Sequence, residues 1–191
     1  MNTTMQATTW FDGSRHAISL IEASIVFGGT HLLREFFSRV AAQNEYGRLV
    51  VVTPFLDAAL LPHLSAFDVE KARITDLLLI TTHREVRSST ARAIAAFLWH
   101  SCEIYALRGL HAKVFAAIPI RGTAVLLMGS HNLTKAGAFN NIEIGVLVTG
   151  TTVETCSSIH SLVDHVIELK AASRMMYDSL SSFPEASGHA A

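Results

Sequence analysis

The chain has 191 residues, of which half are hydrophobic and only 16% are charged, and its formal net charge is −1. A chain of this length fits one domain over residues 1–191, whose folding removes about two-thirds of the unfolded surface from water. The composition excludes a disordered chain, and the near-neutral charge excludes a protein that coats nucleic acid without specificity. A local basic cleft is still compatible with that charge.

Sequence features that report on location favour the cytoplasm. The first ten residues are polar and rich in threonine, and they lack the basic and apolar regions of a signal peptide. No apolar run approaches the roughly 18–20 residues needed to span a bilayer. The cysteines, Cys102 and Cys156, form no C-x-x-C motif, so a reducing compartment is the default. We therefore expect a cytoplasmic protein with no membrane segment.

Apolar runs and helical periodicities alternate along the chain. The short apolar run at residues 49–52 is typical of a strand that is covered on both faces. Gly47 is expected at a helix end, and residues 181–191 are expected to form a frayed tail. In chain order the patterns predict a strand at 18–27, a helix at 32–40, a strand at 49–52, a short helix at 58–67, a strand at 76–81, a helix at 91–99, strands at 102–107 and 112–118, a turn at 119–123, strands at 124–128 and 142–148, and a helix at 153–167.

This alternation predicts an α/β fold in layers, with a mixed, largely parallel sheet. Neither an internal repeat nor a low-complexity linker divides the sequence, so we expect a single domain.

Polar motifs follow one another in the second half of the chain: H-x-K at 111–113, G-S-x-N at 129–132 and N-x-E at 141–143. Residues i and i+2 of a strand share a face, so the predicted strand at 112–118 would project His111 and Lys113 the same way. Asn132 falls just beyond a predicted strand end, and Glu143 opens the next strand. These strand ends are expected to converge on one pocket, as is usual for ligand sites in α/β sheets.

These motifs resemble the signature of the phospholipase D superfamily, H-x-K-x4-D-x6-G-S-x-N, which is often followed by N-x-E. Within the superfamily, residues 129–137 are most similar to those of small bacterial single-motif nucleases. The resemblance implies a phospholipase D-like α/β/α sandwich. The family aspartate is absent, because its position falls on Ile118, or on Arg121 if the alignment uses the turn glycine Gly122. The resemblance implies that this aspartate supports the motif rather than taking part in the chemistry.

The implied mechanism is covalent and uses neither a metal ion nor a cofactor. His111 would attack phosphorus to form a phosphohistidine, and a second histidine would protonate the leaving oxygen. Lys113 and Asn132 would stabilise charge on the phosphoryl oxygens, with Ser130 contributing less. Glu143 would accept a hydrogen bond from the imidazole. A single motif supplies one such histidine, so the resemblance implies a homodimer that joins two copies of His111.

Basic residues near the motifs are candidates for substrate contact. Between residues 104 and 150, four basic residues (Arg108, Lys113, Arg121 and Lys135) face one acidic residue, Glu143. This local surplus would attract a phosphate backbone, and Arg108 and Lys135 are added to Lys113, Ser130 and Asn132 as substrate-binding candidates.

For the other histidines and arginines the sequence supports less specific predictions. His131 occupies the variable position of its motif, so we expect it at the surface. His83, Arg84 and Arg87 follow a predicted strand and fit either a phosphate track or a plain loop face. His160 and His165 are five residues apart and do not share a helical face, so a zinc site is not expected.

The leading hypothesis is a metal-independent phosphodiesterase that cleaves nucleic acid, specifically DNA. Domains of this kind often occur in bacterial defence or DNA-modification systems, so partner proteins of a DNA-processing system are an associated expectation. One alternative is a phospholipase or phosphatidyl transferase, although no Trp-rich amphipathic segment for membrane docking is present. Another alternative, suggested by the missing aspartate, is an inactive or weakly active subunit that binds DNA.

Overall fold

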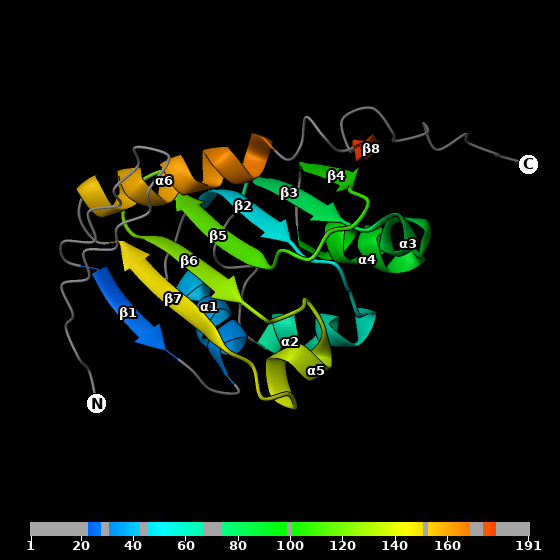
Figure 1. Ribbon diagram of the computed structural model, residues 1–191, viewed down its shortest axis with the longest axis horizontal. Coiled ribbons are helices and arrows are strands. Elements are labelled where there is room, and N and C mark those ends of the chain that lie inside the picture. The colour runs from blue at the N-terminus through cyan, green and yellow to red at the C-terminus, as the bar shows by residue number, and fades with distance from the viewer. Residues whose placement is uncertain are drawn as a thin grey trace, which may run out of the picture.

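The computed structural model describes residues 23–27, 31–42, 46–66, 74–98, 101–150, 153–168 and 174–178. These residues form one eight-stranded sheet in the order β1-β7-β6-β5-β2-β3-β4-β8 (Figure 1). The strands are β1 (Ala23–Phe27), β2 (Tyr46–Val52), β3 (Asp76–Thr81), β4 (Cys102–Ala106), β5 (Val114–Pro119), β6 (Ala124–Gly129), β7 (Gly145–Gly150) and β8 (Arg174–Asp178).

The sheet is mixed, as expected, but its parallel part is smaller than predicted. β2, β3 and β4 pair in parallel, whereas the pairings of β2 with β5, β5 with β6, β6 with β7, β7 with β1 and β4 with β8 are antiparallel. β5 and β6 are joined by a turn at residues 120–123, which is too short for a parallel crossover and reverses the chain. The longer connection from β6 to β7 contains α5 and returns at the same end of the sheet, so this pairing is antiparallel too.

Helices cover both faces of the sheet and create two separate cores. They are α1 (Leu32–Ala41), the 3-10 turn η1 (Ala58–Leu60), α2 (Leu61–Ala66), α3 (His83–Arg87), α4 (Ser89–Leu98), α5 (Lys135–Phe139) and α6 (Val153–Glu168). Leu49 and Val51 of β2 belong to the core under α1, and the alternate residues Val50 and Val52 belong to the core under α6. Figure 1 shows α1 and α6 on opposite faces of the sheet. This arrangement confirms the predicted α/β/α sandwich.

The amphipathic pattern of α1 shows how the sequence specifies one of these layers. Leu32, Leu33, Phe36, Phe37 and Val40 recur at helical spacing, and all five are buried. Phe36 packs edge-on against Phe37 and also lies against the Phe115 ring of β5. Burial of this one face therefore fixes α1 on the sheet.

Several predicted boundaries are wrong. The helix predicted over residues 32–40 ends before Gly47, which instead lies inside β2. β5 begins at Val114 and β7 at Gly145, each later than predicted, and the short helices α3 and α5 and the strand β8 were not anticipated. The predicted start of the first strand at 18–22 and the tail at 181–191 lie outside the described residues. Among the described helices, none is long and apolar enough to cross a membrane.

Candidate active site at one edge of the sheet

The three polar motifs meet at one edge of the sheet. β5 and β7 begin at this edge and β6 ends there, because both pairings are antiparallel. Val114 lies opposite Met128, and Gly129 lies opposite Gly145. The backbone N–H of Gly129 also donates to the carbonyl of Lys113 at 3.3 Å. The H-x-K, G-S-x-N and N-x-E segments therefore lie beside one another, as the sequence predicted.

Gly129 allows β6 and β7 to approach closely at the start of the G-S-x-N segment. A Cβ atom at position 129 would lie 2.3 Å from the carbonyl oxygen of Ile144, a distance that no side chain tolerates. One residue later, the N–H of Ser130 donates to the same carbonyl at 2.8 Å, and Ser130 Oγ accepts from the N–H of Ile144 at 3.0 Å. Ser130 is thus tied to the next strand by both backbone and side chain.

Glu143 is buried and forms hydrogen bonds with two other motif residues, Ser130 and Asn141. Only 6% of Glu143 is exposed. The hydroxyl of Ser130 donates to one carboxylate oxygen, and Nδ2 of Asn141 donates to the other at 3.1 Å. The hydrogen bond predicted between Glu143 and the His111 imidazole is not among those of the described residues. The structure therefore couples Glu143 to Ser130 and Asn141.

His111 and Lys113 lie in the loop before β5 rather than on the strand. The expectation that they share a strand face is therefore wrong, because the pairing of β5 begins only at Val114. His111 is exposed and Lys113 is half-buried. Nζ of Lys113 donates to the carbonyl of His111 at 2.9 Å, so the ammonium group lies over the turn that carries the histidine. A histidine in this position is accessible to a substrate.

Asn132 is positioned by the loop that follows β2. Thr53 is fully buried, and its Oγ1 accepts from the N–H of Leu133 at 3.3 Å. The N–H of Asp57 donates to the carbonyl of Leu133 at 3.0 Å, and Leu56 forms a bridge with the same residue. Thr53 directly follows the strand predicted at residues 49–52, and no sequence pattern marks it as part of the site. The signal that it positions Asn132 is a tertiary contact, which spacing does not reveal.

The side chain of Asn132 keeps part of its hydrogen-bonding capacity unused. Its Oδ1 is buried and has no partner among the described residues, while its backbone carbonyl accepts from Thr134 at 2.8 Å. Buried amide oxygens normally have a partner. Oδ1 is an acceptor and can pair only with a donor on a ligand, whereas a phosphate oxygen would accept from Nδ2 of the same side chain.

His131 is buried, so the prediction of a surface histidine is wrong. Its side chain is completely enclosed, and neither ring nitrogen has a partner among the described residues. A Cβ on Gly145 would lie 3.1 Å from the ring, so that glycine makes room for the imidazole. Burial lowers the pKa of His131 below the usual 6.5, and the Glu143 carboxylate opposes this shift. A neutral, enclosed imidazole is not available to a substrate.

Lys135 and Arg108, the two basic residues added as substrate-binding candidates, fall on the same edge, whereas Arg121 of the charge count does not. Lys135 is exposed at the start of α5, where its backbone N–H donates to Asp57 Oδ2 at 3.4 Å. Arg108 is exposed in the loop between β4 and β5. Arg121, however, lies in the turn between β5 and β6, at the opposite edge. It therefore adds nothing to the charge around His111.

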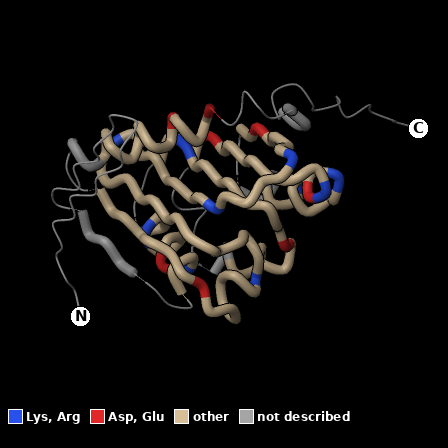
Figure 2. Tube along the Cα trace, viewed as in Figure 1, with Lys and Arg blue, Asp and Glu red and all other residues tan. Residues whose placement is uncertain are grey.

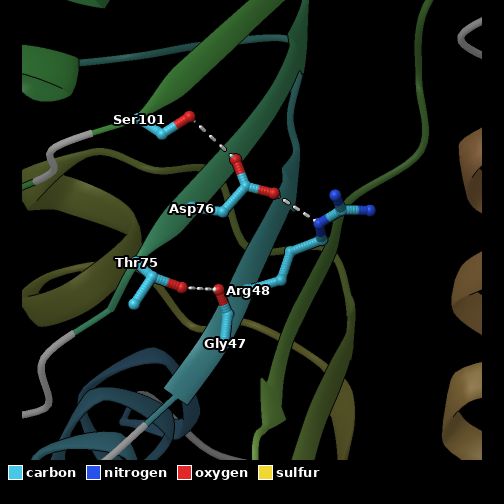
Figure 3. A network of polar contacts seen from close by, with 5 residues as sticks. All are labelled: Gly47, Arg48, Thr75, Asp76 and Ser101. Atoms are coloured by element: carbon cyan, nitrogen blue, oxygen red, sulfur yellow. Dashed lines mark hydrogen bonds and ion pairs between the residues drawn. The ribbon is translucent and has the colours of Figure 1, made fainter.

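The three motif segments, residues 111–113, 129–132 and 141–143, define one end of the sheet, called the motif edge. The position of the missing aspartate lies far from it. Ile118 lies near the far end of β5, where it packs in the core under α6, opposite Arg48 of β2. The carboxylate beside Arg48 comes from Asp76 of β3, whose Oδ2 accepts from Arg48 Nε at 2.6 Å (Figure 3). Position 118 is five residues beyond Lys113, or about 17 Å along a strand. A side chain there has no access to the site.

Two other expectations concern metals and cysteines. Over the residues that the structure describes, no group of three or more histidine, cysteine or acidic side chains is arranged to hold a metal ion. His160 and His165 both lie on α6. Cys102 is buried in β4 and Cys156 is half-buried on α6.

The sequence matches no protein-family model and no curated protein, so the comparisons rest on solved structures. The phospholipase D family member Nuc from Salmonella typhimurium is 18% identical with a TM-score of 0.56, and the match covers 81% of this chain and 99% of that one. NucT from Helicobacter pylori is 11% identical with a TM-score of 0.55, at the same coverages. Phosphatidylserine synthase from Haemophilus influenzae is 13% identical with a TM-score of 0.50, covering 91% of this chain and 46% of that one.

These similarities define the class of structure. The chain has the phospholipase D-like α/β fold, as its motifs indicated, and it spans nearly the full length of Nuc and NucT. At such low identities the likeness establishes the fold alone, and the residues at the motif edge carry the argument about function.

Proposed function

We propose that this protein is a metal-independent phosphodiesterase that cleaves nucleic acid, specifically DNA, through a covalent intermediate on His111. The observation that carries the proposal is the convergence of three motif segments on one edge of a phospholipase D-like sheet. There an exposed histidine lies beside a half-buried lysine, and the segment that carries Asn132 follows the neighbouring strand β6. Nucleophile and phosphate ligands are the groups that such a reaction requires.

The reaction would proceed in two displacements. An imidazole nitrogen of His111 forms a bond to phosphorus, and the bond from phosphorus to the leaving oxygen breaks. Lys113 and Asn132 stabilise the negative charge on the non-bridging oxygens while the leaving oxygen takes a proton from a second histidine. Water then attacks phosphorus, releases His111 and leaves a phosphate monoester. The Glu143 carboxylate contributes by fixing Ser130 and Asn141, to which it is hydrogen-bonded.

The second histidine would come from another copy of the chain. Of the histidines in the motif segments, His131 is enclosed and leaves only His111 accessible. Ile142 and Ile144 flank Glu143 and are 87% and 76% exposed. Large apolar side chains exposed together at a site favour burial against a partner. We therefore infer a homodimer in which His111 of the partner subunit completes the site.

The direct test of the proposed activity is cleavage of labelled DNA in the presence of EDTA. We expect His111→Ala to lower turnover by at least about 10³-fold, since it removes the nucleophile. Arg121→Gln, which changes an exposed residue at the opposite edge, is the control and should cleave at the wild-type rate. Equal cleavage by wild type and His111→Ala would contradict the mechanism.

The homodimer has a separate test with a matched control. The pair Ile142→Asp and Ile144→Asp should convert a sedimenting dimer to a monomer at micromolar concentration and abolish cleavage, because the site then lacks its second histidine. Ile120 is also exposed, at 54%, but lies in the turn between β5 and β6. Ile120→Asp should leave the dimer intact. A wild-type chain that is strictly monomeric and active would contradict this part of the proposal.

A second candidate function is a DNA-binding subunit with little or no turnover. The observation that favours it is that both Glu143 oxygens are engaged by Ser130 and Asn141, so His111 has no carboxylate to orient it within the described residues. DNA binding by purified protein with no cleavage, unchanged in His111→Ala, would support this candidate. Turnover by the purified chain alone would exclude it.

A further inference from the structure

Exposed arginines gather on α3 and α4, beside the motif edge. Arg84, Arg87 and Arg92 are exposed, and none of them takes part in the ion pairs found among the described residues. The one acidic residue of this pair of helices, Glu85, is only 9% exposed. Figure 2 shows the basic segments along α3 and α4. The outer surface of the two helices is therefore positively charged.

The connection between β4 and β5 links this surface to His111. β4 lies three places from β5 in the sheet, so the loop between them crosses the ends of β3 and β2. The N–H of Leu107 donates to the carbonyl of Thr81 at 2.8 Å, which places the loop against the end of β3, two residues before α3 begins. The next residue, Arg108, is exposed. The loop then continues to His111 and Lys113.

The spacing along this edge suits consecutive phosphates. β3 lies two strand positions from β5, which corresponds to about 10 Å at roughly 4.8 Å per strand. A nucleic acid strand advances about 3.4 Å per nucleotide in a duplex, so about three nucleotides cover this span. The acidic side chain of Asp57 on the same edge is occupied, since its oxygens accept from the N–H groups of Ala59 and Lys135.

We propose that Arg84, Arg87, Arg92 and Arg108 form a track that binds the backbone of a nucleic acid strand about three nucleotides from the phosphodiester at His111. This inference rests on the proposed function for the position of the scissile bond. The track makes the preferred substrate a polynucleotide rather than a small phosphodiester. Its contacts are to phosphates, so it adds affinity without sequence preference.

A nucleic acid strand fits this surface better than an anionic membrane does. Membrane-surface helices present large apolar side chains beside their basic residues. Over residues 83–94 of α3 and α4, for which the structure describes burial, no large hydrophobic side chain is exposed. In that segment the arginines therefore lack the apolar neighbours of a membrane-docking helix.

The test compares two substrates and measures binding as a function of salt. Arg84→Gln, Arg87→Gln and Arg92→Gln are combined, and Arg121→Gln serves as the control for an exposed arginine at the opposite edge. For a DNA duplex of about 20 base pairs, the plot of log affinity against log salt should be less steep by about three in the combined variant, or about 0.9 per arginine. Arg121→Gln should keep the wild-type slope. Turnover of bis(4-nitrophenyl) phosphate, which is too small to reach the track, should be unchanged in both.

The outcomes separate this inference from the proposed function. A wild-type slope in the combined variant would overturn the track even if the protein cleaves DNA. So would a loss of binding to vesicles containing phosphatidylserine without any effect on the oligonucleotide. Conversely, wild-type protein that cleaves neither substrate, but binds the duplex through these arginines, would retain the track and contradict the proposed activity.

Discussion

The two ends of the strands, the motif edge and the opposite or far edge, differ in whether their polar groups have hydrogen-bond partners. At the far edge, Arg48 pairs with Asp76, Thr75 donates to the carbonyl of Gly47, and Ser101 donates to Asp76, so this exposed network is mutually satisfied (Figure 3). At the motif edge, His131 and Asn132 have buried polar atoms without partners among the described residues. Unsatisfied buried groups destabilise a fold. Their concentration at the motif edge shows that this end of the sheet is less favourable to stability than the far edge.

The largest expected effect comes from disrupting the close backbone packing of Gly129 at the motif edge. Gly129→Ala places a Cβ against backbone atoms of Ile144 and Gly145 that have no room to move. We expect it to lower the free energy of unfolding by about 3 kcal/mol, measured by urea denaturation. In Gly47→Ala at the far edge, the new Cβ meets the flexible Ile120 side chain at 3.2 Å and backbone atoms only at ordinary van der Waals distances of 3.7 and 3.9 Å, so stability should change by less than about 1 kcal/mol. Equal effects would remove the distinction between the edges.

The buried hydroxyl of Thr53 provides the second contrast. Thr53→Val removes the acceptor of the Leu133 N–H in the loop that holds Asn132, and we expect a loss of about 2 kcal/mol together with lower turnover. Thr75→Val removes a hydroxyl at the far edge whose carbonyl partner on Gly47 can turn to water. Its expected effect, on stability alone, is below about 1 kcal/mol. Thermal denaturation and DNA cleavage of both variants would measure this difference. Equal losses of stability, with turnover unchanged in Thr53→Val, would contradict the role given to Thr53.

The enclosed imidazole of His131 makes stability depend on pH. Because burial lowers its pKa in the folded state, the unfolded chain binds the proton first as the pH falls through about 6.5. The free energy of unfolding should therefore decrease below that pH. His131→Leu should flatten this part of the profile, whereas His160→Leu, at an exposed position on α6, should keep it. A wild-type profile in His131→Leu would show that the decrease has another origin.

The ion pair at the far edge has the smallest expected effect. Arg48 and Asp76 are 48% and 25% exposed in their side chains, and such pairs contribute less than about 1 kcal/mol. Asp76→Asn should leave DNA cleavage unchanged, since the pair lies at the opposite end of the strands. A double-mutant cycle with Arg48→Gln in urea would measure the interaction, and a value well above that range would contradict the account of this edge.

Much of the fold follows from sequence patterns because its elements carry their own periodicity. The buried face of α1 and the apolar runs of β2 and β3 are visible without any tertiary information. The starts of β5 and β7 were predicted too early because polar motif residues precede them, and only the partner strand determines where pairing begins. The short helices α3 and α5 lack an apolar period long enough to detect.

The site likewise has features that follow from local sequence and features that depend on tertiary contacts. The motifs predicted that their three segments lie at one edge of the sheet, because each segment borders a predicted strand end. The burial of His131, the role of Thr53 and the partners of Glu143 depend on contacts between segments far apart in the sequence, or on how two strands approach. Local residue type does not encode such contacts. The charge count likewise included Arg121, although the strand reversal puts it at the other edge.

The most direct measurement is to trap the covalent intermediate. Protein and end-labelled DNA would be mixed in EDTA and quenched in denaturing alkali, in which a phosphoryl bond to histidine survives. We expect label that migrates with the protein and maps by mass spectrometry to the peptide containing His111, and no such label in His111→Ala. Cleavage by the wild type without such an adduct, or an adduct on a different residue, would contradict it.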